Sequence, residues 1–317
     1  MTQPAGPTSA ARHKAPAASS IVVVGNVRNC GTWIAETISE LERALSVFRR
    51  VQWLIIESDS DDDSRKQLAA LAQRIEQFDV RHLGTLRERI PLRTERLAFC
   101  RNSSLNEIKH AERYRDVDYV LVVDLDGLTG LLTAAGIASC WDRDDWDVCT
   151  ANQRGPYYDI WTLRHPFWSP NDCWQQYRVM TALGIAKSEA ESSAVYSRMV
   201  TIPEDAAWIE VESAFGGLAI YRREAIVRGA YHGLSSDGEE VSDHIALHRE
   251  LRALGFRIFI NPRLVNFLSD RSPDQDTPLQ RAQRNVVLAV KHGVRRMFGE
   301  SWVTRVAIWL RRKRRMR

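Results

Sequence analysis

The sequence predicts a protein of the α/β class, with a mostly parallel β-sheet flanked by helices. Two observations lead to this prediction. Short apolar runs alternate with amphipathic segments from residue 21 to residue 128, a pattern typical of parallel sheets whose two faces are both covered. Three of the apolar runs also end in polar clusters. Because the carboxyl ends of parallel strands share one edge of a sheet, we expect these clusters to converge on a ligand site there.

The first half of the chain is predicted to follow the order β-α-β-α-β-α-β. Its helices are indicated by apolar residues at helical spacing, as in Ile34, Ile38, Leu41 and Leu45. Ser64 is placed to cap the second helix. The expected elements are a strand at 21–29, a helix at 32–45, a strand at 51–63, a helix at 64–78, a short strand at 80–84, a helix at 92–113 and a strand at 119–126.

The second half of the chain is less regular. The aromatic, turn-rich stretch 153–177 is expected to be a binding loop, and Gly255 is expected to close a helix. The expected elements are a strand at 145–152, a strand entering a short helix at 215–226, a helix at 242–256 and a final strand at 257–265.

Composition divides the chain into three parts. Residues 1–20, rich in Pro, Ala and Ser, are predicted to be a disordered lead rather than a signal peptide, because they lack an apolar segment. Residues 21–270 are predicted to form the globular domain, and residues 271–317 a linker and a basic amphipathic helix. Residues 281–317 carry twelve Lys and Arg against one acid, Glu300, whereas the whole chain has a net charge of +4. The body is therefore acidic and the tail basic.

The cysteines favour a reducing compartment. There are five of them, an odd number, and no two are spaced as C-x-x-C, so neither a disulfide framework nor a zinc cluster is expected. No window offers the roughly 18 continuous apolar residues that a membrane-spanning helix needs. A cytoplasmic protein is therefore expected.

Two carboxylates follow the apolar run 119–123, at Asp124 and Asp126. Alternate side chains of an extended segment share a face, so both carboxylates can point the same way. Two adjacent carboxylates repel each other unless a cation lies between them or one binds a proton. Mg²⁺ or Mn²⁺ suits such a site, because hard cations prefer oxygen ligands and often bind one or two carboxylates together with substrate phosphates. The alternative is that the pair simply ends a strand and caps the turn.

Seven stretches, in this order and spacing, carry a resemblance to a known family: "GNVRNCGTWI" (25–34), "IIESDSDDDS" (55–64), "RTERLAFCRNSSL" (93–105), "DYVLVVDLDGL" (118–128), "YYDIWTLR" (157–164), "ESAFGGLAIYRREAI" (212–226) and "SDHIALHRELRALGFRIFINPRL" (242–264). Together they resemble a GT-A glycosyltransferase, a nucleotide-sugar-dependent enzyme with a D-x-D metal motif. They are most similar to the fungal capsule-associated α-1,3-mannosyltransferase family. The resemblance implies a Rossmann-like GT-A fold, a Mn²⁺ or Mg²⁺ cofactor, a nucleotide-sugar donor and a glycan or lipid-linked acceptor. GDP-mannose is favoured as the donor by analogy.

The resemblance implies a nucleotide site built from residues after the strands and on the third helix. Those after the first two strands would line the nucleotide pocket and accept hydrogen bonds from base or ribose: Arg28, Asn29, Glu57 and Asp59. Three arginines at offsets of three and five would offer positive charge to the diphosphate: Arg93, Arg96 and Arg101. The structural alternatives are a solvated acidic loop and a solvated helix face.

The resemblance also implies a metal and sugar site. Asp126 would be the main metal ligand, and Asp124 would bind ribose or metal. His244 would complete the metal site, since a neutral imidazole can bind Mn²⁺. Gly216 and Gly217 would let the backbone approach the donor sugar, unless they form only a β-bulge.

The stereochemistry of transfer is left open by the sequence. An inverting transferase needs a carboxylate base for the acceptor hydroxyl, and Asp243 is the candidate. A family that transfers α-mannose from an α-linked donor implies retention, in which case the departing phosphate serves as base and Asp243 would position the acceptor or the metal ligand. Glu212 is a further candidate on the acceptor side.

The basic tail adds a prediction of its own. Apolar residues recur at near-helical intervals between Val286 and Leu310, with Trp302 and Trp309 among them, and the chain ends in "RRKRRMR". Such a helix can lie on an anionic membrane surface, which would place the protein at the inner face of the membrane. A docked C-terminal helix is the second interpretation, and nucleic-acid binding is the least favoured.

Two other functions remain as alternatives. A nucleotidyltransferase has a similar sheet and acidic metal site, and a Gly-rich loop with a lysine after the first strand would favour it. The stretch "GNVRNCG" has two glycines and no lysine. The non-enzymatic alternative is a membrane- or nucleic-acid-binding adaptor with a degenerate transferase domain.

Overall fold

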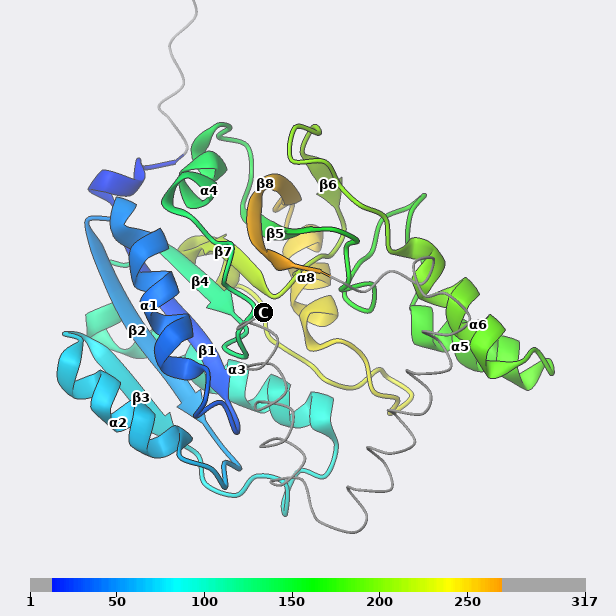
Figure 1. Cartoon of the computed structure of the whole chain (residues 1–317), viewed down its shortest axis with the longest axis horizontal. Coiled ribbons are helices and arrows are strands. Elements are labelled where there is room, and N and C mark those ends of the chain that lie inside the picture. The colour runs from blue at the N-terminus through cyan, green and yellow to red at the C-terminus, as the bar shows by residue number, and fades with distance from the viewer. Residues whose placement is uncertain (1–12, 270–317) are drawn as a thin grey trace, which may run out of the picture. The chain divides into compact units, whose positions relative to one another are not determined.

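One mixed eight-stranded sheet organises residues 13–269, the part of the chain that the computed structural model describes (Figure 1). Its strand order is β3-β2-β1-β4-β7-β5-β8-β6. β7 pairs antiparallel with β4 and β5, β6 pairs antiparallel with β8, and the other pairings are parallel. The strands are β1 (Ser20–Val27), β2 (Arg50–Glu57), β3 (Phe78–His82), β4 (Tyr119–Val123), β5 (Val148–Arg154), β6 (Ile209–Val211), β7 (Leu218–Arg222) and β8 (Ile258–Leu268).

Helices cover both faces of this sheet, as the sequence predicted. Alternate residues of β1 enter different cores: Ile21 and Val23 pack with α1 and α2, whereas Val22 and Val24 pack with α3 and α8. The strand period of two thus gives each face its own apolar layer. The helices are α1 (Ile34–Ala44), α2 (Ser64–Arg74), α3 (Arg93–His110), α4 (Ala134–Ala138), α5 (Cys173–Ala182), α6 (Lys187–Ala194), α7 (Arg223–Ile226) and α8 (Asp243–Ala253). Five short 3₁₀ turns join them within residues 13–269: Pro16–Ala18, Leu45–Val47, Glu112–Tyr114, Ser139–Trp141 and Tyr196–Arg198.

The predicted elements differ from the structure mainly at their ends. The helix expected at 64–78 is wrong in its last turn, because α2 ends at Arg74 and Phe78 begins β3. The helix stops at its C-cap, Ile75, whose backbone is already extended (φ −105°, ψ 121°), and Phe78 packs on Trp53 with ring centroids 5.7 Å apart. The stretch 153–177 is not all loop, since α5 begins at Cys173. Gly255 closes α8 with a φ of 86°, as expected.

The antiparallel direction of β7 positions the site. Leu218, the first residue of β7, pairs with Val123, the last residue of β4. The turn before β7 therefore lies at the same edge of the sheet as the residues after β4. A parallel β7 would have placed the two glycines of this turn at the opposite edge.

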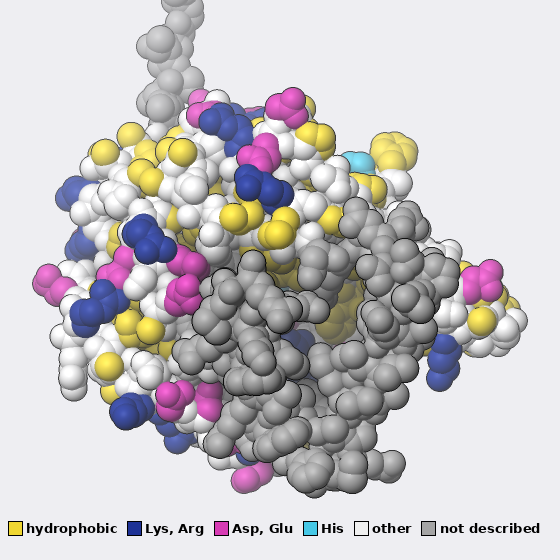
Figure 2. Space-filling model, viewed as in Figure 1, with side chains coloured by type: hydrophobic (Ala, Val, Ile, Leu, Met, Phe, Trp, Pro, Cys, Tyr) yellow, Lys and Arg dark blue, Asp and Glu magenta, His cyan; other side chains and the backbone are white. Residues whose placement is uncertain are grey.

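Part of the predicted lead belongs to the fold. His13 is buried, and its ring nitrogens lie 3.2 Å from the Tyr119 hydroxyl and 3.0 Å from the Trp146 carbonyl oxygen. Residues 1–12, and the linker and basic tail predicted for 271–317, lie outside the described residues. Within 13–269 no helix is long and apolar enough to cross a membrane. Figure 2 shows acidic and basic side chains interspersed over the visible face.

Candidate functional site

The three polar clusters converge at one edge of the sheet, as predicted. Asn29, after β1, accepts a hydrogen bond from the Asp61 backbone N–H over 2.9 Å and donates its own N–H to the Ser60 hydroxyl over 3.2 Å. Burial, together with the charges of Asp126, Asp62 and Asp124, raises the pKa of Cys30 to about 11. Residues following β1, β2 and β4 therefore lie close enough to share one electrostatic field.

Arg101 on α3 lies at the middle of this edge. Its Nη2 donates to Asp124 Oδ1 over 3.2 Å, and its Nε lies 3.2 Å from Asp243 Oδ2. The guanidinium carbon lies 5.2 Å from the centroid of Phe215 and 5.7 Å from that of Tyr231. We call these five residues the Arg101 centre. Burial opposes the charge of Arg101, but Asp243 and Asp124 outweigh it and raise the pKa of Arg101 above its usual value.

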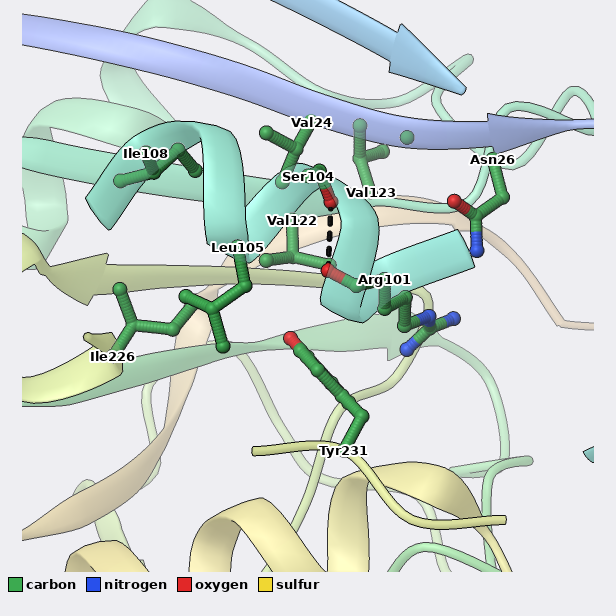
Figure 3. Close-up of a pocket in the computed structure, with 11 residues that line it drawn as sticks. Val24, Asn26, Arg101, Ser104, Leu105, Ile108, Val122, Val123, Ile226 and Tyr231 are labelled. Carbon is green, nitrogen blue, oxygen red and sulfur yellow. Dashed lines mark hydrogen bonds between the residues drawn. The ribbon is translucent and has the colours of Figure 1, made fainter. Parts of the chain in front are cut away.

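A small cavity of about 10 Å³ lies beneath Arg101, between α3 and the sheet (Figure 3). Such a volume has room for about one water molecule. Its walls include Asn26, Arg101 and Tyr231; in Figure 3 the Asn26 amide points toward the Arg101 guanidinium, and the Tyr231 ring lies below Arg101. Asn26 Nδ2 and Arg101 Nη1 are buried without a hydrogen-bond partner among the described residues. Within residues 13–269 the cavity therefore has two unused donors, although most of the side chains that line it are apolar.

Carboxylates exceed cations around Arg101. Burial and the charges of Asp126, Asp159 and Asp243 raise the pKa of Asp124 to about 7, while Arg101 opposes the rise. Burial also raises the pKa of Asp159 and of Asp243. Arg101, with the charge of Arg93 also acting on Asp243, is therefore outnumbered by four aspartates, an arrangement that favours binding of an additional cation.

The carboxylates fit a divalent cation, but the predicted histidine does not join them. Asp126 is exposed and Asp124 is half-buried, so their oxygens can meet an ion brought with a ligand. Among residues 13–269, no group of three or more His, Cys, Asp or Glu side chains is gathered as a metal site. A metal here would therefore need ligands from the substrate or water in addition to Asp124 and Asp126.

His244, on α8, instead lies in the core on the side of the sheet that α3 and α8 cover. Its ring stacks on Phe215 with centroids 3.9 Å apart, and its Nδ1 lies 3.4 Å from the Tyr221 hydroxyl. Burial, Arg101 and His248 lower the pKa of His244 well below its usual value. These contacts favour a neutral histidine that supports the aromatic wall of the Arg101 centre.

His248, one turn further along α8, is buried with both ring nitrogens bonded. Nδ1 lies 2.8 Å from the Ser213 hydroxyl and Nε2 lies 2.8 Å from the Tyr221 hydroxyl. Burial, and then the charge of Arg101, lower its pKa to about 3. The native ring is therefore neutral across the range in which an unfolded histidine, with a pKa of about 6.5, binds a proton.

This histidine predicts a pH-dependent stability. Between about pH 6.5 and pH 3 the unfolded chain binds one more proton at His248 than the native chain, so the free energy of unfolding falls as the pH falls. The expected slope is about 1.4 kcal/mol per pH unit. Urea unfolding at pH 6, 5 and 4 measures this effect. The difference in the free energy of unfolding between wild type and His248→Gln should shrink at this rate as the pH falls. The exposed His232→Gln is the control, and parallel curves for wild type and His248→Gln would contradict the prediction.

Gly216 and Gly217 form a tight turn with φ of 67° and 83°. The Gly216 carbonyl oxygen accepts hydrogen bonds from Asn266 Nδ2 over 2.7 Å and from Gln153 Nε2 over 3.0 Å. The Gly217 carbonyl oxygen accepts the Asp124 N–H over 2.9 Å. A Cβ on Gly216 would lie 2.8 Å from the Ala151 carbonyl oxygen. Both backbone conformation and packing therefore require glycine at 216.

We expect Gly216→Ala to destabilise the fold more than the same change at Gly238. Gly238 also has a positive φ, 79°, but its added Cβ would meet no atom within 4 Å. Gly238→Ala should cost about 1–2 kcal/mol of unfolding free energy from backbone strain alone, and Gly216→Ala at least about 1 kcal/mol more from overpacking. Thermal and urea unfolding of the two variants measures the difference, and equal losses would show that packing at Gly216 is unimportant.

The arginines predicted on α3 separate into two groups. Arg93 and Arg101 lie about 80° apart around the helix, whereas Arg96 and Arg101 lie about 140° apart, because each residue turns the helix by about 100°. The charge of Arg93 acts on Asp243. Arg96 Nη1 instead donates to the carbonyl oxygens of Ile90 and Pro91, over 2.7 Å and 2.6 Å. Arg101 therefore contacts Asp243, Arg93 acts on it through its charge, and Arg96 is held by the backbone before α3.

Glu57 and Asp59, the two acids predicted to bind the nucleotide base or ribose, make hydrogen bonds within the protein itself. Glu57 is buried, and its carboxylate accepts hydrogen bonds from Arg65 Nε, His82 and the Ser60 N–H over 2.9, 2.8 and 3.2 Å. Its oxygens are used within the fold, so it organises the loop after β2. Asp59 has a φ of 58° and accepts the Arg87 N–H over 3.0 Å.

The remaining candidates lie at the rim of the site or outside it. Arg28 is exposed at the end of β1. Glu212 is exposed as well, and its backbone N–H donates to the Arg164 carbonyl oxygen over 2.9 Å. Within the described residues, no contact joins its carboxylate to the Arg101 centre.

Asp159 is the site residue that sequence reasoning missed. It contributes to the charge around Asp124, and its Oδ2 accepts the Gly216 N–H over 3.0 Å. The available signal was an aspartate in the turn "YYDIW" (157–161) among large aromatic residues, a setting in which a carboxylate needs buried partners.

Comparisons with known proteins relate the chain to solved structures only. No family model matches it, and no curated protein matches it. A mannosyltransferase from Pyrobaculum calidifontis, solved with GDP-Man and Mn²⁺, matches 84% of this chain and 61% of its own, at 14% identity and a TM-score of 0.47. Glucosyl-3-phosphoglycerate synthase from Mycobacterium tuberculosis, solved with UDP, matches 83% and 76%, at 13% identity and a TM-score of 0.39.

A third similar structure is S. aureus TarS 1–349, which matches 80% of this chain and 59% of its own, at 16% identity and a TM-score of 0.40. This chain therefore spans less than two thirds of the Pyrobaculum and TarS proteins. Matches at these identities and TM-scores assign neither a family nor an activity. The resemblance to the fungal capsule-associated family stays a prediction.

Proposed function

We propose that this chain is a metal-dependent glycosyltransferase of the GT-A type. It transfers a sugar from a nucleotide-diphosphate sugar to a glycan or glycolipid acceptor. The observation that supports this most is the Arg101 centre: a buried arginine held by Asp124 and Asp243, with Asp126 exposed beside it, at the carboxyl edge of the sheet. An excess of carboxylates over the arginines Arg101 and Arg93 suits a ligand that brings both a diphosphate and a divalent cation.

Each group then has a role in binding and orientation. Asp126 and Asp124 hold Mn²⁺ or Mg²⁺, which when bound neutralises the diphosphate leaving group. Arg93 and Arg101 add positive charge on the same side. The turn at Gly216 and Gly217 has no Cβ, so the donor sugar can approach its backbone closely.

Transfer breaks the bond between the anomeric carbon and the phosphate oxygen and forms one to the acceptor oxygen. We propose that the configuration is retained, with the departing phosphate oxygen taking the proton of the acceptor hydroxyl. Asp243 is held against Arg101 Nε at 3.2 Å, which suits a role in positioning better than one as a free base. Anomeric analysis of the product by NMR tests this step: a β-linked product from an α-linked donor would assign an inverting mechanism.

The donor and location are proposals on the basis of the family resemblance and the tail. GDP-mannose is the favoured donor, and residues 281–317 are proposed to bind an anionic membrane surface from the cytoplasmic side. Flotation with phosphatidylserine vesicles should carry the full chain but not a form ending at Arg281. Equal flotation of the two forms would reject the tail as the membrane-binding segment.

The proposed activity is tested by titrating GDP- and UDP-sugars into the protein with and without Mn²⁺ by calorimetry. Mn²⁺-dependent binding of a nucleotide-sugar, followed by its slow hydrolysis, is the expected result. Binding of a nucleoside triphosphate with release of pyrophosphate would favour the nucleotidyltransferase alternative. If no nucleotide binds, the adaptor alternative stands.

A further inference from the structure

A chain of buried hydrogen bonds joins three segments around the Arg101 centre. Asp159 Oδ2 accepts the Gly216 N–H over 3.0 Å, and Asp159 Oδ1 accepts the Thr162 hydroxyl over 2.9 Å. The Thr162 and Ser242 hydroxyls lie 2.8 Å apart. Thr162 and Ser242 are both buried, at 4% and 5% exposure. The Thr162 hydroxyl donates its proton to Asp159, so Ser242 must donate to the Thr162 oxygen.

The position of Ser242 in this chain is unusual for a serine at the start of a helix. Ser242 is the N-cap of α8, yet its side chain makes no capping bond to the helix, although serine commonly caps in this way. Its hydroxyl is directed to Thr162 instead. The next residue is Asp243, which pairs with Arg101. The contact therefore exchanges a capping bond for a link between α8 and the 159–162 turn.

We propose that Asp159 is a positioning residue of the active site. Through Thr162 it holds the Gly216 turn and the N-terminus of α8 in one arrangement. Each end of this link is followed by a residue that contacts the Arg101 centre or belongs to it. Gly217, after Gly216, accepts the Asp124 N–H, and Asp243, after Ser242, pairs with Arg101. The consequence for catalysis rests on the proposed function, whereas the link itself is independent of it.

The experiment removes the central hydroxyl and follows both ends of the link. Thr162→Val keeps the shape and removes the hydroxyl, and Thr162→Ser keeps the hydroxyl. Thr181→Val is the matched control, because among residues 13–269 its hydroxyl bonds only to backbone oxygens of α5, at Tyr177 and Arg178. ¹⁵N-glycine spectra report the Gly216 amide, which selective carbonyl labelling of phenylalanine restricts to Gly216 and Gly299, the two glycines that follow phenylalanine. The Nε–H of Arg101, assigned by its loss in Arg101→Lys, reports the other end.

Thr162→Val should shift both the Gly216 amide and the Arg101 Nε–H, while Thr162→Ser and Thr181→Val shift neither. With a nucleotide-sugar substrate, Thr162→Val should lower kcat about tenfold and change KM for the donor less than twofold. Ser242→Ala should change kcat and KM in the same way. The double variant Thr162→Val, Ser242→Ala should have a kcat no lower than that of either single variant, because one substitution already breaks the link.

Two results would overturn the proposal. One is an Arg101 Nε–H resonance that does not shift in Thr162→Val. Whatever the activity, this would show that the link does not reach the Arg101 centre. The other is a kcat for Thr162→Val that equals the kcat of Thr181→Val. If the wild type turns over no nucleotide-sugar, the proposed function fails, and the two resonances alone support or reject the link.

Discussion

Replacing Arg101 by methionine should lower the free energy of unfolding by about 3–5 kcal/mol, because it leaves two partly buried carboxylates, Asp124 and Asp243, without their cation. The side chain of Arg101 is 11% exposed, and that of Asp243 is 7% exposed. Neither carboxylate can recover its full hydration when the arginine is lost. Urea unfolding at pH 7.5 measures the loss, and the same variant should bind a nucleotide-sugar at least tenfold more weakly.

Arg113 offers a matched control. It also pairs with two carboxylates, Asp79 and Glu107, and its guanidinium also lies over an aromatic ring, that of Tyr114, at 5.2 Å. Its side chain, however, is 42% exposed, so Arg113→Met should cost less than about 1 kcal/mol. Adding Asp124→Asn and Asp243→Asn to Arg101→Met should restore part of the stability. Equal losses for Arg101→Met and Arg113→Met would show that burial does not strengthen the Arg101 centre.

The fold was predictable where burial imposes a pattern. The strands β1, β2 and β4 are apolar runs because both faces of the sheet are covered, and α1 has a clear apolar stripe because one side faces the sheet. The helices α5 and α6 were not predicted, because they bury few residues: Cys173 on α5, and Ala190 and Ala194 on α6. With so few buried positions, no periodic signal is left in the sequence.

The direction of a strand leaves even less signal in the sequence than a mostly exposed helix does. The run at 218–222 is apolar whether it pairs parallel or antiparallel, so the sequence could not show that Gly217 returns beside Asp124. For the same reason the partners of Asp159, which lie 57 and 3 residues away along the chain, could not be foreseen as a set.

Elementary helix geometry could have refined one part of the site. Arg93, Arg96 and Arg101 look like one basic stripe in the sequence, but a spacing of five residues places Arg96 and Arg101 on different sides of α3. Conversely, the pairing of Arg101 with Asp124 and Asp243, 23 and 142 positions away, depends on tertiary structure. Local spacing can therefore exclude a residue from a site more readily than it can identify the partners of the one that remains.

Asp126→Ala should weaken Mn²⁺-dependent binding of a nucleotide-sugar at least about 100-fold, equivalent to about 2.7 kcal/mol, while leaving the free energy of unfolding nearly unchanged. Asp126 is exposed at the end of β4, so its loss removes little packing. Its charge helps to raise the pKa of Asp124, so removing it relieves repulsion between the two carboxylates. Loss of binding together with equal or slightly higher stability is the pattern expected of a residue kept for a cation rather than for the fold.

Calorimetric titration of GDP-mannose at fixed Mn²⁺, and of Mn²⁺ at fixed GDP, separates the contribution of the metal from that of the nucleotide. Asp116→Ala is the matched control, because Asp116 is an exposed aspartate before β4, at the opposite edge of the sheet from Asp126. It should leave both titrations unchanged. If Asp126→Ala binds donor and Mn²⁺ as the wild type does, Asp126 is not the metal ligand, and the excess of carboxylates around Arg101 must be balanced by a bound proton or by another cation.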